Sequence, residues 1–387
     1  MIAPLLAALA LTLPPTVGFQ HSSGLDVVLV EQPGLPLVSV GFVLLDDPRQ
    51  APDLQREVGR QLLRARVGDP DGLTAHELRL QGGDAEPVDV ADGQLWSFGV
   101  APGQLPIFLD HLAELLSRPQ PVDDREGRAW GSMPGNSSAG LQQLAQARAL
   151  GHDQRTPPPS GPWPRVFVDH ATAWVVPGNA RLIVAGAIDE VELRKHLDHA
   201  LASWPKATPE PLRAARLRDA DSEPVAQVLG LRGAEQAAYA VAFRLPPAGL
   251  RSVAAWLLAT EFVGSEPVWR LAARPEQGLY SASALGGASA EELQGDLIGA
   301  LEALVDGLPP DLHARRVRLV RNRLIAGMAG RAGAVATWAQ LRALGLGATE
   351  FPTLLAALDE VSHEDLAAFA AALLSGSQRV DVLETVQ

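Results

Sequence analysis

Apolar and polar positions divide the first half of the chain into a short series of strands and helices. Two alternating apolar runs flank a Pro/Gly turn in residues 25–47 (LDVVLVEQPGLPLVSVGFVLLDD), and this pattern predicts a β-hairpin. Residues 53–63 (DLQREVGRQLL) follow with helical spacing. A strand leading into an amphipathic helix is predicted over residues 94–119, and a strand followed by a helix ending near a tryptophan over residues 174–205.

A similar order of elements begins again near residue 225. Residues 225–246 predict a second hairpin. The elements predicted after it are a helix at residues 250–264, a short helix at 266–277, a strand at 278–287, and two helices at 290–308 and 311–330. A repeat of about 190 residues indicates a duplicated domain rather than a solenoid unit.

This repeat sets the predicted domain organisation. We expect an α+β fold with two tandem homologous domains, each a mostly antiparallel sheet packed with helices, over residues 21–206 and 225–387. Residues 207–224 are rich in Pro, Ala and charge and have no apolar period, so they predict a linker. Residues 1–20 are predicted to be a signal peptide or an N-terminal extension.

The N-terminal segment is compatible with two cellular locations for this protein. Residues 2–13 form an apolar run of signal-peptide length that is too short to span a bilayer. No Lys or Arg precedes Arg49, whereas a signal peptide usually begins with basic residues. We expect an exported, periplasmic protein without a transmembrane segment, and a cytoplasmic protein is the alternative.

Composition excludes several classes of function. Hydrophobic residues make up 47% of the chain and charged residues 20%, which is typical of a globular protein. The net charge of −13 argues against nucleic acid or an anionic membrane as the partner. The chain has no cysteine, so it has neither a disulfide framework nor a cysteine-based metal site or nucleophile.

Several of these segments, taken in order, resemble one enzyme family. The hairpin at residues 25–47, the helix at 53–63, the segment LTAHELRLQGGDAEP at 73–87 and the segment WVVPGNARLIVAGAIDEVELRKHLDHALASWP at 174–205 are similar to the pitrilysin/insulinase family of zinc metallopeptidases. The resemblance is to the bacterial two-domain, processing-peptidase-like type and covers residues 23–380. It implies a half of a clamshell, in which two tandem α+β domains form one shell and expose an inner sheet face to a chamber.

The resemblance also implies that the zinc motif is lost. In the family, the helix at this place reads G-L-A-H-L-L-E-H-M-L-F, and its two zinc-binding histidines fall on Arg56 and Arg60. Its catalytic glutamate falls on Gly59. A third ligand falls on Met133, seven residues after a matching Glu126. Arginine has no lone pair to offer a metal, glycine has no carboxylate, and a thioether is a poor zinc ligand, so we expect no metal in this chain.

A second family feature has a partial counterpart. The family places an arginine and a tyrosine seven residues apart in its second domain, where they contact substrate and stabilise the tetrahedral intermediate. The segment RPEQGLY offers Arg274 and Tyr280, which are six residues apart. One residue has then been deleted, or, because only one strand fits after this point, Tyr280 is simply a strand residue.

Two functions follow from the resemblance. The first is a non-catalytic subunit that pairs with a zinc-bearing homologue, completes a peptide-degrading chamber and contributes Arg274 and Tyr280 to a peptide substrate. The second is a scaffold or interaction protein with no role in proteolysis. A peptidase with relocated ligands is a distant third, because His196 and His199, with Asp198 and Glu192, are typical of a solvated helix face.

Overall fold

The structure of the chain is a computed structural model. It describes residues 13–34, 37–45, 52–64, 88–90, 93–117, 138–151, 163–204, 206–207, 225–231, 236–246, 249–261, 269–274, 278–286, 289–375 and 379–386. The predicted linker therefore lies almost wholly outside the described residues, as does the predicted signal segment up to residue 12. Thr16–Gln20, which we assigned to that segment, form strand β1 of the first sheet.

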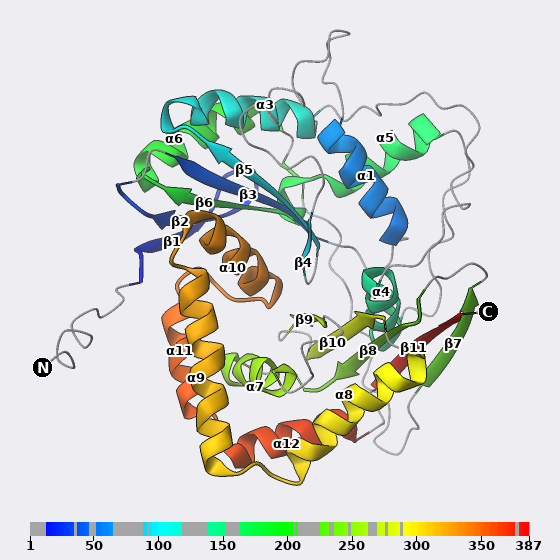
Figure 1. Ribbon diagram of the computed structural model, residues 1–387. Helices are drawn as coiled ribbons and strands as arrows, with labels where there is room; N and C mark the ends of the chain where they lie inside the picture. The colour runs from blue at the N-terminus through cyan, green and yellow to red at the C-terminus, as the bar shows by residue number, and fades with distance from the viewer. Residues whose placement is uncertain are drawn as a thin grey trace, which may run out of the picture.

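Two sheets form the framework of the molecule (Figure 1). Sheet A has the order β1-β2-β6-β3-β5-β4 and sheet B the order β7-β11-β8-β10-β9. The strands of sheet A are β1 (Thr16–Gln20), β2 (Asp26–Glu31), β3 (Val38–Leu45), β4 (Val88–Val90), β5 (Gly93–Val100) and β6 (Ala180–Gly186). Those of sheet B are β7 (Val225–Leu231), β8 (Ala238–Arg244), β9 (Arg270–Arg274), β10 (Leu279–Leu285) and β11 (Arg379–Val386).

The two sheets share one topology, which confirms the predicted α+β fold and the internal repeat. In each half the last strand, β6 or β11, lies between the first two strands of the repeat. It runs parallel to one neighbour, β2 or β7, and antiparallel to the other, β3 or β8. Both predicted hairpins are therefore wrong, because the strands of each are separated by a strand from far along the chain.

Eleven helices in the described residues pack around the sheets. They are α1 (Pro52–Arg64), α3 (Leu105–Ser117), α4 (Ser138–Ala149), α5 (Trp163–Trp174), α6 (Glu190–Ala200), α7 (Leu250–Thr260), α8 (Ala290–Val305), α9 (Pro310–Gly327), α10 (Arg331–Ala343), α11 (Phe351–Glu360) and α12 (His363–Leu374). The predicted helices at 53–63, 250–264, 290–308 and 311–330 are confirmed as α1, α7, α8 and α9. The predicted short helix at 266–277 is wrong, since its described part contains strand β9.

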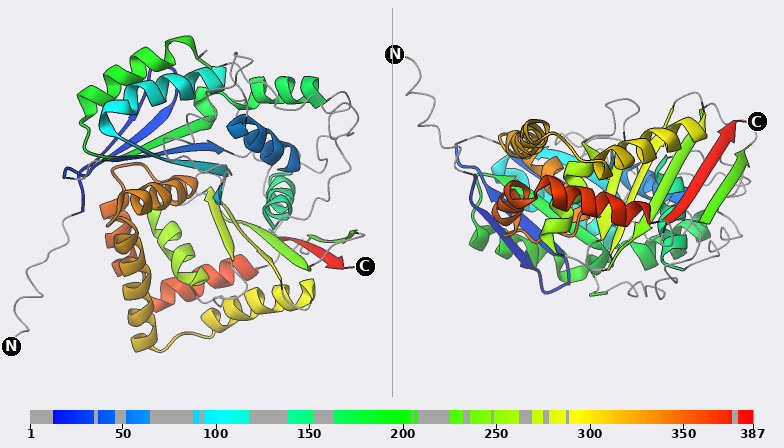
Figure 2. Two further views of the ribbon diagram at one scale, coloured as in Figure 1. Left: turned by 45° about the horizontal axis from the view of Figure 1, so that its top comes forward. Right: turned by 90° about the horizontal axis from the view of Figure 1, so that it is seen from below.

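Each half contributes one helix to the sheet of the other half (Figures 1 and 2). Helix α4 of the first half packs on β8, β10 and β11, where Leu141, Leu144 and Ala145 join the alanines of β8 in one apolar cluster. Helix α10 of the second half packs on β3 and β6 of sheet A. Gly41 of β3 allows this approach, because a Cβ there would lie 2.4 Å from Val335 Cγ1.

This exchange covers sheet surface that the resemblance led us to expect would be exposed. Every residue of β8 is buried, and so are most residues of β2, β3 and β6. The expectation of a bare inner sheet face is therefore wrong for β3, β6 and β8, because α10 packs on β3 and β6 and α4 packs on β8. Among the described residues, no helix is both long and apolar enough to cross a membrane.

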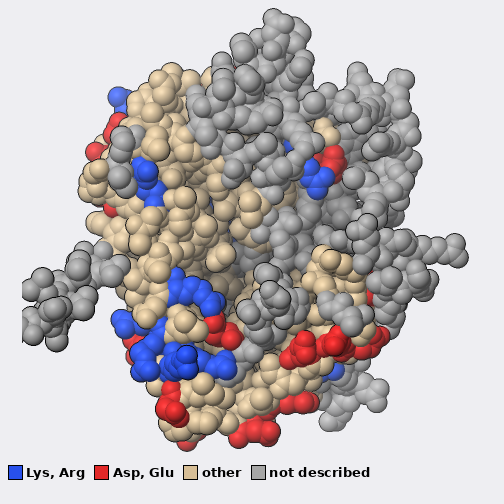
Figure 3. Space-filling model, viewed as in Figure 1, with Lys and Arg blue, Asp and Glu red and all other residues tan. Residues whose placement is uncertain are grey.

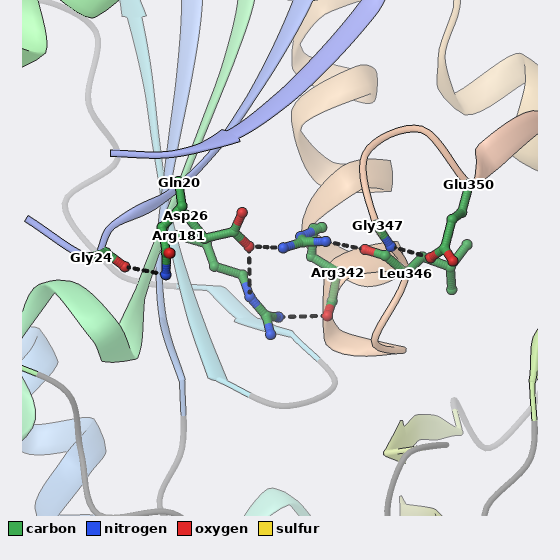
Figure 4. Close-up of polar contacts among 8 residues, drawn as sticks. All are labelled: Gln20, Gly24, Asp26, Arg181, Arg342, Leu346, Gly347 and Glu350. Atoms are coloured by element: carbon green, nitrogen blue, oxygen red, sulfur yellow. Dashed lines mark hydrogen bonds and ion pairs between the residues drawn. The ribbon is translucent and has the colours of Figure 1, made fainter. Parts of the chain in front are cut away.

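A polar network fastens α10 to the first residues of β2 and β6 in sheet A (Figure 4). Asp26 of β2 forms ion pairs with Arg342, at the end of α10, and with Arg181 of β6. Arg181 donates to the backbone carbonyl of Arg342, and Arg342 donates to that of Leu346. Burial lowers the pKa of Arg342, an effect that Glu350 opposes. The two halves are thus joined by charges that lie partly out of water, where an unpaired charge is costly.

We expect Asp26→Asn to lower the free energy of unfolding by about 1–3 kcal/mol, since Arg342 then keeps its charge in a partly buried site without the carboxylate that forms its ion pair. Urea unfolding measures this value. Asp169→Asn is the control, because Asp169 and Arg165 form an ion pair on the surface and its loss changes stability by about 0.5 kcal/mol or less. Equal effects of the two substitutions would show that the network does not stabilise the contact between the halves.

Candidate functional site

Helix α1 lies where the resemblance places the zinc motif. Leu54, Val58 and Leu62 recur every four residues along it and are buried in the core of the first half. This apolar stripe fixes the rotation of the helix against sheet A. The stripe also fixes the position of Gly59, which directly follows the buried Val58 and is itself buried.

The side chain of Gln94 occupies the space beside Gly59. Gln94 lies on β5 and is completely buried. A Cβ built on Gly59 would lie 2.1 Å from Oε1 of Gln94 and 2.9 Å from its Cδ, so no larger residue fits unless this amide moves. Neither polar atom of the Gln94 side chain has a hydrogen-bond partner among the described residues. A neutral amide thus lies beside Gly59, the position to which the resemblance assigns the catalytic carboxylate.

Arg60, at the second histidine position, takes part in a local network on α1. Its Nη1 donates to Oε2 of Glu57 at 2.7 Å, and Nε2 of Gln61 donates to the other carboxylate oxygen at 2.9 Å. The Glu57 side chain is only 16% exposed, so the arginine supplies the countercharge that this carboxylate needs. For Arg56, the structure describes only its place in the helix.

The described residues offer no alternative metal site. No group of three or more His, Asp or Glu side chains in this part of the chain is close enough to hold a metal ion. His196 Nε2 lies 3.5 Å from Glu192 Oε1 on α6, an i, i+4 pair without a further ligand. Glu126 and Met133 lie outside the described residues, so the third ligand position stays a prediction.

Tyr280 lies in the core of the second half. It is fully buried, and its ring packs 5.6 Å from that of Trp256 on α7 and 5.4 Å from that of Phe369 on α12. Burial raises the pKa of its hydroxyl, an effect that the Ser252 hydroxyl opposes. The residue therefore fills the layer between sheet B and its helices.

The strand register does not set Arg274 opposite Tyr280. In the β9–β10 pair, Tyr280 is opposite Ala273, and Arg274 is opposite Leu279. One strand, β10, follows this turn, as the sequence predicts. Substrate contact by Arg274 and Tyr280 stays a prediction, and the burial of Tyr280 favours the alternative in which it is a strand residue.

A Ser–His–Asp group that the sequence analysis missed lies near the turn after β1. His21 Nδ1 is 2.9 Å from Ser23 Oγ, and His21 Nε2 is 3.0 Å from Asp198 Oδ1 on α6. The backbone N–H of Ser23 also donates to Nδ1, so the proton resides on Nε2 and is donated to Asp198. Ser23 Oγ accepts from the backbone N–H of Leu25, and Ser23 is buried. The group holds a turn against α6 and presents no accessible nucleophile.

Gly59→Ala should destabilise the protein by about 1–3 kcal/mol in urea unfolding, because the added Cβ displaces the buried Gln94 amide. In a Gln94→Ala background the same change should stabilise by up to about 1 kcal/mol, since alanine is the better helix former. Gly103→Ala is the control, because Gly103 is exposed and a Cβ there meets nothing within 4 Å, so the change should not destabilise the protein. The same sign of effect in both backgrounds would contradict the assignment of Gln94.

Comparison with known proteins finds one family model and several solved structures that are similar to this chain. The model of the peptidase M16 inactive domain matches residues 166–296. The whole chain resembles a protease from Helicobacter pylori (TM-score 0.69, 14% identity, covering 96% of this chain and 100% of that one). It also resembles a peptidase M16 inactive domain from Pseudomonas fluorescens (TM-score 0.64, 14% identity, 96% and 98%).

A third similarity is to a longer protein. The periplasmic protease PqqL from Escherichia coli is matched with a TM-score of 0.58 and 12% identity, over 96% of this chain but only 48% of PqqL. No curated protein matches in sequence. The low identities show a shared fold and nothing more about activity. The chain therefore shares the fold of M16-like peptidases, and residues 166–296 match the inactive domain of that family.

Proposed function

We propose that this protein is a non-catalytic half shell that pairs with a zinc-bearing homologue and acts in proteolysis through that partner. The contact between Gly59 and Gln94 is the observation that carries the proposal. Hydrolysis by a metallopeptidase needs ligands for zinc and a base that activates water. At the corresponding place this chain has a glycine under a buried neutral amide and an arginine already paired with Glu57.

The length of the similar proteins supports pairing with a second half. This chain matches the whole length of the H. pylori protease but about half of PqqL, so PqqL has room for a second unit of similar size. This chain corresponds to one such unit. A homologue with zinc ligands would supply the missing chemistry, and the periplasmic location of PqqL supports, by analogy, the predicted export of this chain.

The second candidate function is a scaffold without any role in proteolysis, and the burial of Tyr280 favours it. A side chain enclosed by Trp256 and Phe369 reaches no substrate unless the helical layer opens. Purification of the tagged chain from its native cell tests the two functions. Co-purification of a zinc-bearing homologue with peptidase activity supports the first, and its absence supports the second.

The purified chain is expected to bind no stoichiometric zinc and to cleave no peptide on its own. The physical reason is that arginine carries a permanent charge and no acceptor atom, while Gly59 supplies no base. Elemental analysis after dialysis, combined with a peptide-cleavage assay, measures both properties. One zinc ion retained per chain would overturn the positions assigned to Arg56 and Arg60.

Tyr280→Phe should leave the peptidase activity of an assembled complex unchanged. A residue that stabilised the oxyanion would cost about two to three orders of magnitude in rate when its donor is removed. The same substitution at Tyr239, the chain's other tyrosine, is the matched control, and its effect is measured on stability. Tyr239 donates to Asp381 Oδ1 at 2.6 Å, so Tyr239→Phe should lower the free energy of unfolding by about 1–3 kcal/mol. A large loss of rate in Tyr280→Phe with unchanged assembly would restore Tyr280 as a substrate contact.

A further inference from the structure

Two consecutive helices of the second half carry opposite charge. Helix α9 has five arginines within nine residues, although the chain as a whole carries a net charge of −13. Helix α8 has four acidic residues and no basic one, and Asp306 follows at its C-terminal end. Figure 3 shows both groups on one face of the molecule, with Lys and Arg gathered over α9 and Asp and Glu over α8. The arginines of α9 are Arg315, Arg316, Arg318, Arg321 and Arg323.

The outward face of α9 combines available arginines with an exposed apolar residue. Val317 and Val320 point into the core, whereas Arg315, Arg318 and Leu319 are exposed. Leu319 is 49% exposed, one of the more exposed large apolar residues in the described chain. Arg315 and Arg318 form no ion pair with any residue that the structure describes. Their guanidinium groups are therefore available to carboxylates of another molecule.

Two other arginines of α9 are already paired within the chain. Arg321 lies 3.7 Å from Asp359 of α11, and Arg323 forms an ion pair with Glu261 at the end of α7. These contacts fix the flanks of α9. The outward face of α9, defined by Arg315, Arg318 and Leu319, takes no part in these contacts and can bind another molecule.

The outward face of α8 has the complementary character. Gly295 and Gly299 are exposed, and a Cβ at either site would meet nothing within 4 Å, so the surface between the acidic side chains is smooth. Glu302 and Asp306 lie in the last turn and at the C-cap of α8, where the helix dipole disfavours negative charge. Neither forms an ion pair with a described residue. A cation from another molecule would offset the unfavourable interaction with the helix dipole and would supply the ion pair that Glu302 and Asp306 lack.

We propose that α9 of one copy of this chain docks on α8 of a second copy, in a two-fold dimer whose other half is the reciprocal contact. A two-fold axis brings each surface patch against its counterpart on the partner, so a face that carries both charges is self-complementary. Arg315 and Arg318 of one copy then meet Glu302 and Asp306 of the other. Leu319 packs on the smooth surface at Gly295 and Gly299.

A second copy fits this face better than other polyanions do. The acidic helix beside α9 and the net charge of −13 repel nucleic acid and anionic lipid, while they complement the same face of another copy. The contact involves neither α1 nor any zinc-bearing homologue. It therefore goes beyond the proposed function, and each can fail without the other.

Charge reversal in the full-length chain tests the dimer. Sedimentation equilibrium at low salt should show a monomer–dimer equilibrium that shifts to monomer at 1 M salt, where the Debye length is about 3 Å. Arg315→Glu with Arg318→Glu should lower the association constant by about tenfold or more, and Glu302→Arg with Asp306→Arg should do the same. An equimolar mixture of these two variants should regain the dimer, because both contacts in the mixed pair are again between opposite charges.

The matched control is Arg165→Glu with Lys195→Glu, which reverses two exposed charges on α5 and α6 and should leave association unchanged. Circular dichroism of each variant confirms that it is folded. A monomer at every protein concentration in low salt, or two variants that stay monomeric when mixed, overturns the proposal. Binding of polyglutamate by a strictly monomeric chain also overturns it, in favour of an acidic foreign protein.

Discussion

The exchange of helices between the two halves is the contact on which the rest of the molecule depends. Without α4, the alanine-rich face of β8 would be open to water, and without α10 the same would hold for part of β3 and β6. The chemistry of the two contacts differs. Nε2 of Gln146 donates to Ser281 Oγ at 2.8 Å, a neutral bond, whereas α10 is held by the charges of Asp26, Arg181 and Arg342. Each half therefore completes the core of the other.

The sequence predicts the individual helices and strands of this fold better than it predicts which strands lie side by side in each sheet. Apolar spacing identifies α1, α7, α8 and α9, because one buried face repeats every three to four residues. It fails for the hairpins, since β6 and β11 enter the sheets from far along the chain and no local pattern announces them. It also fails for β9, where the Trp269–Arg274 stretch is too short for its period to decide between helix and strand.

The residues of the candidate site also differ in whether the sequence alone could identify them. The family resemblance leads to Gly59 and Arg60, because both are judged position by position along one helix. Gln94 could not be found in this way, since it comes from β5 and its importance lies in a contact 35 residues away in sequence. The burial of Tyr280 is likewise a property of the layer formed by α7, α12 and sheet B. The sequence leaves two roles for Tyr280, a substrate contact or a strand residue, and its packing in the core favours the strand residue.

Electrostatics gives a reason why the positions that the resemblance assigns to a zinc site would change together. A zinc ion balances the charge of the carboxylates around it, so without the metal a glutamate at position 59 would be a buried charge with no partner. A glycine beside the neutral amide of Gln94 avoids that cost. Arg60, the next residue, is only partly buried, and its permanent positive charge is tolerated because Glu57 forms an ion pair with it. In a helix without a bound metal, each polar group needs a partner within the protein. Helix α1 has a glycine beside a neutral amide at position 59 and an ion-paired arginine at position 60.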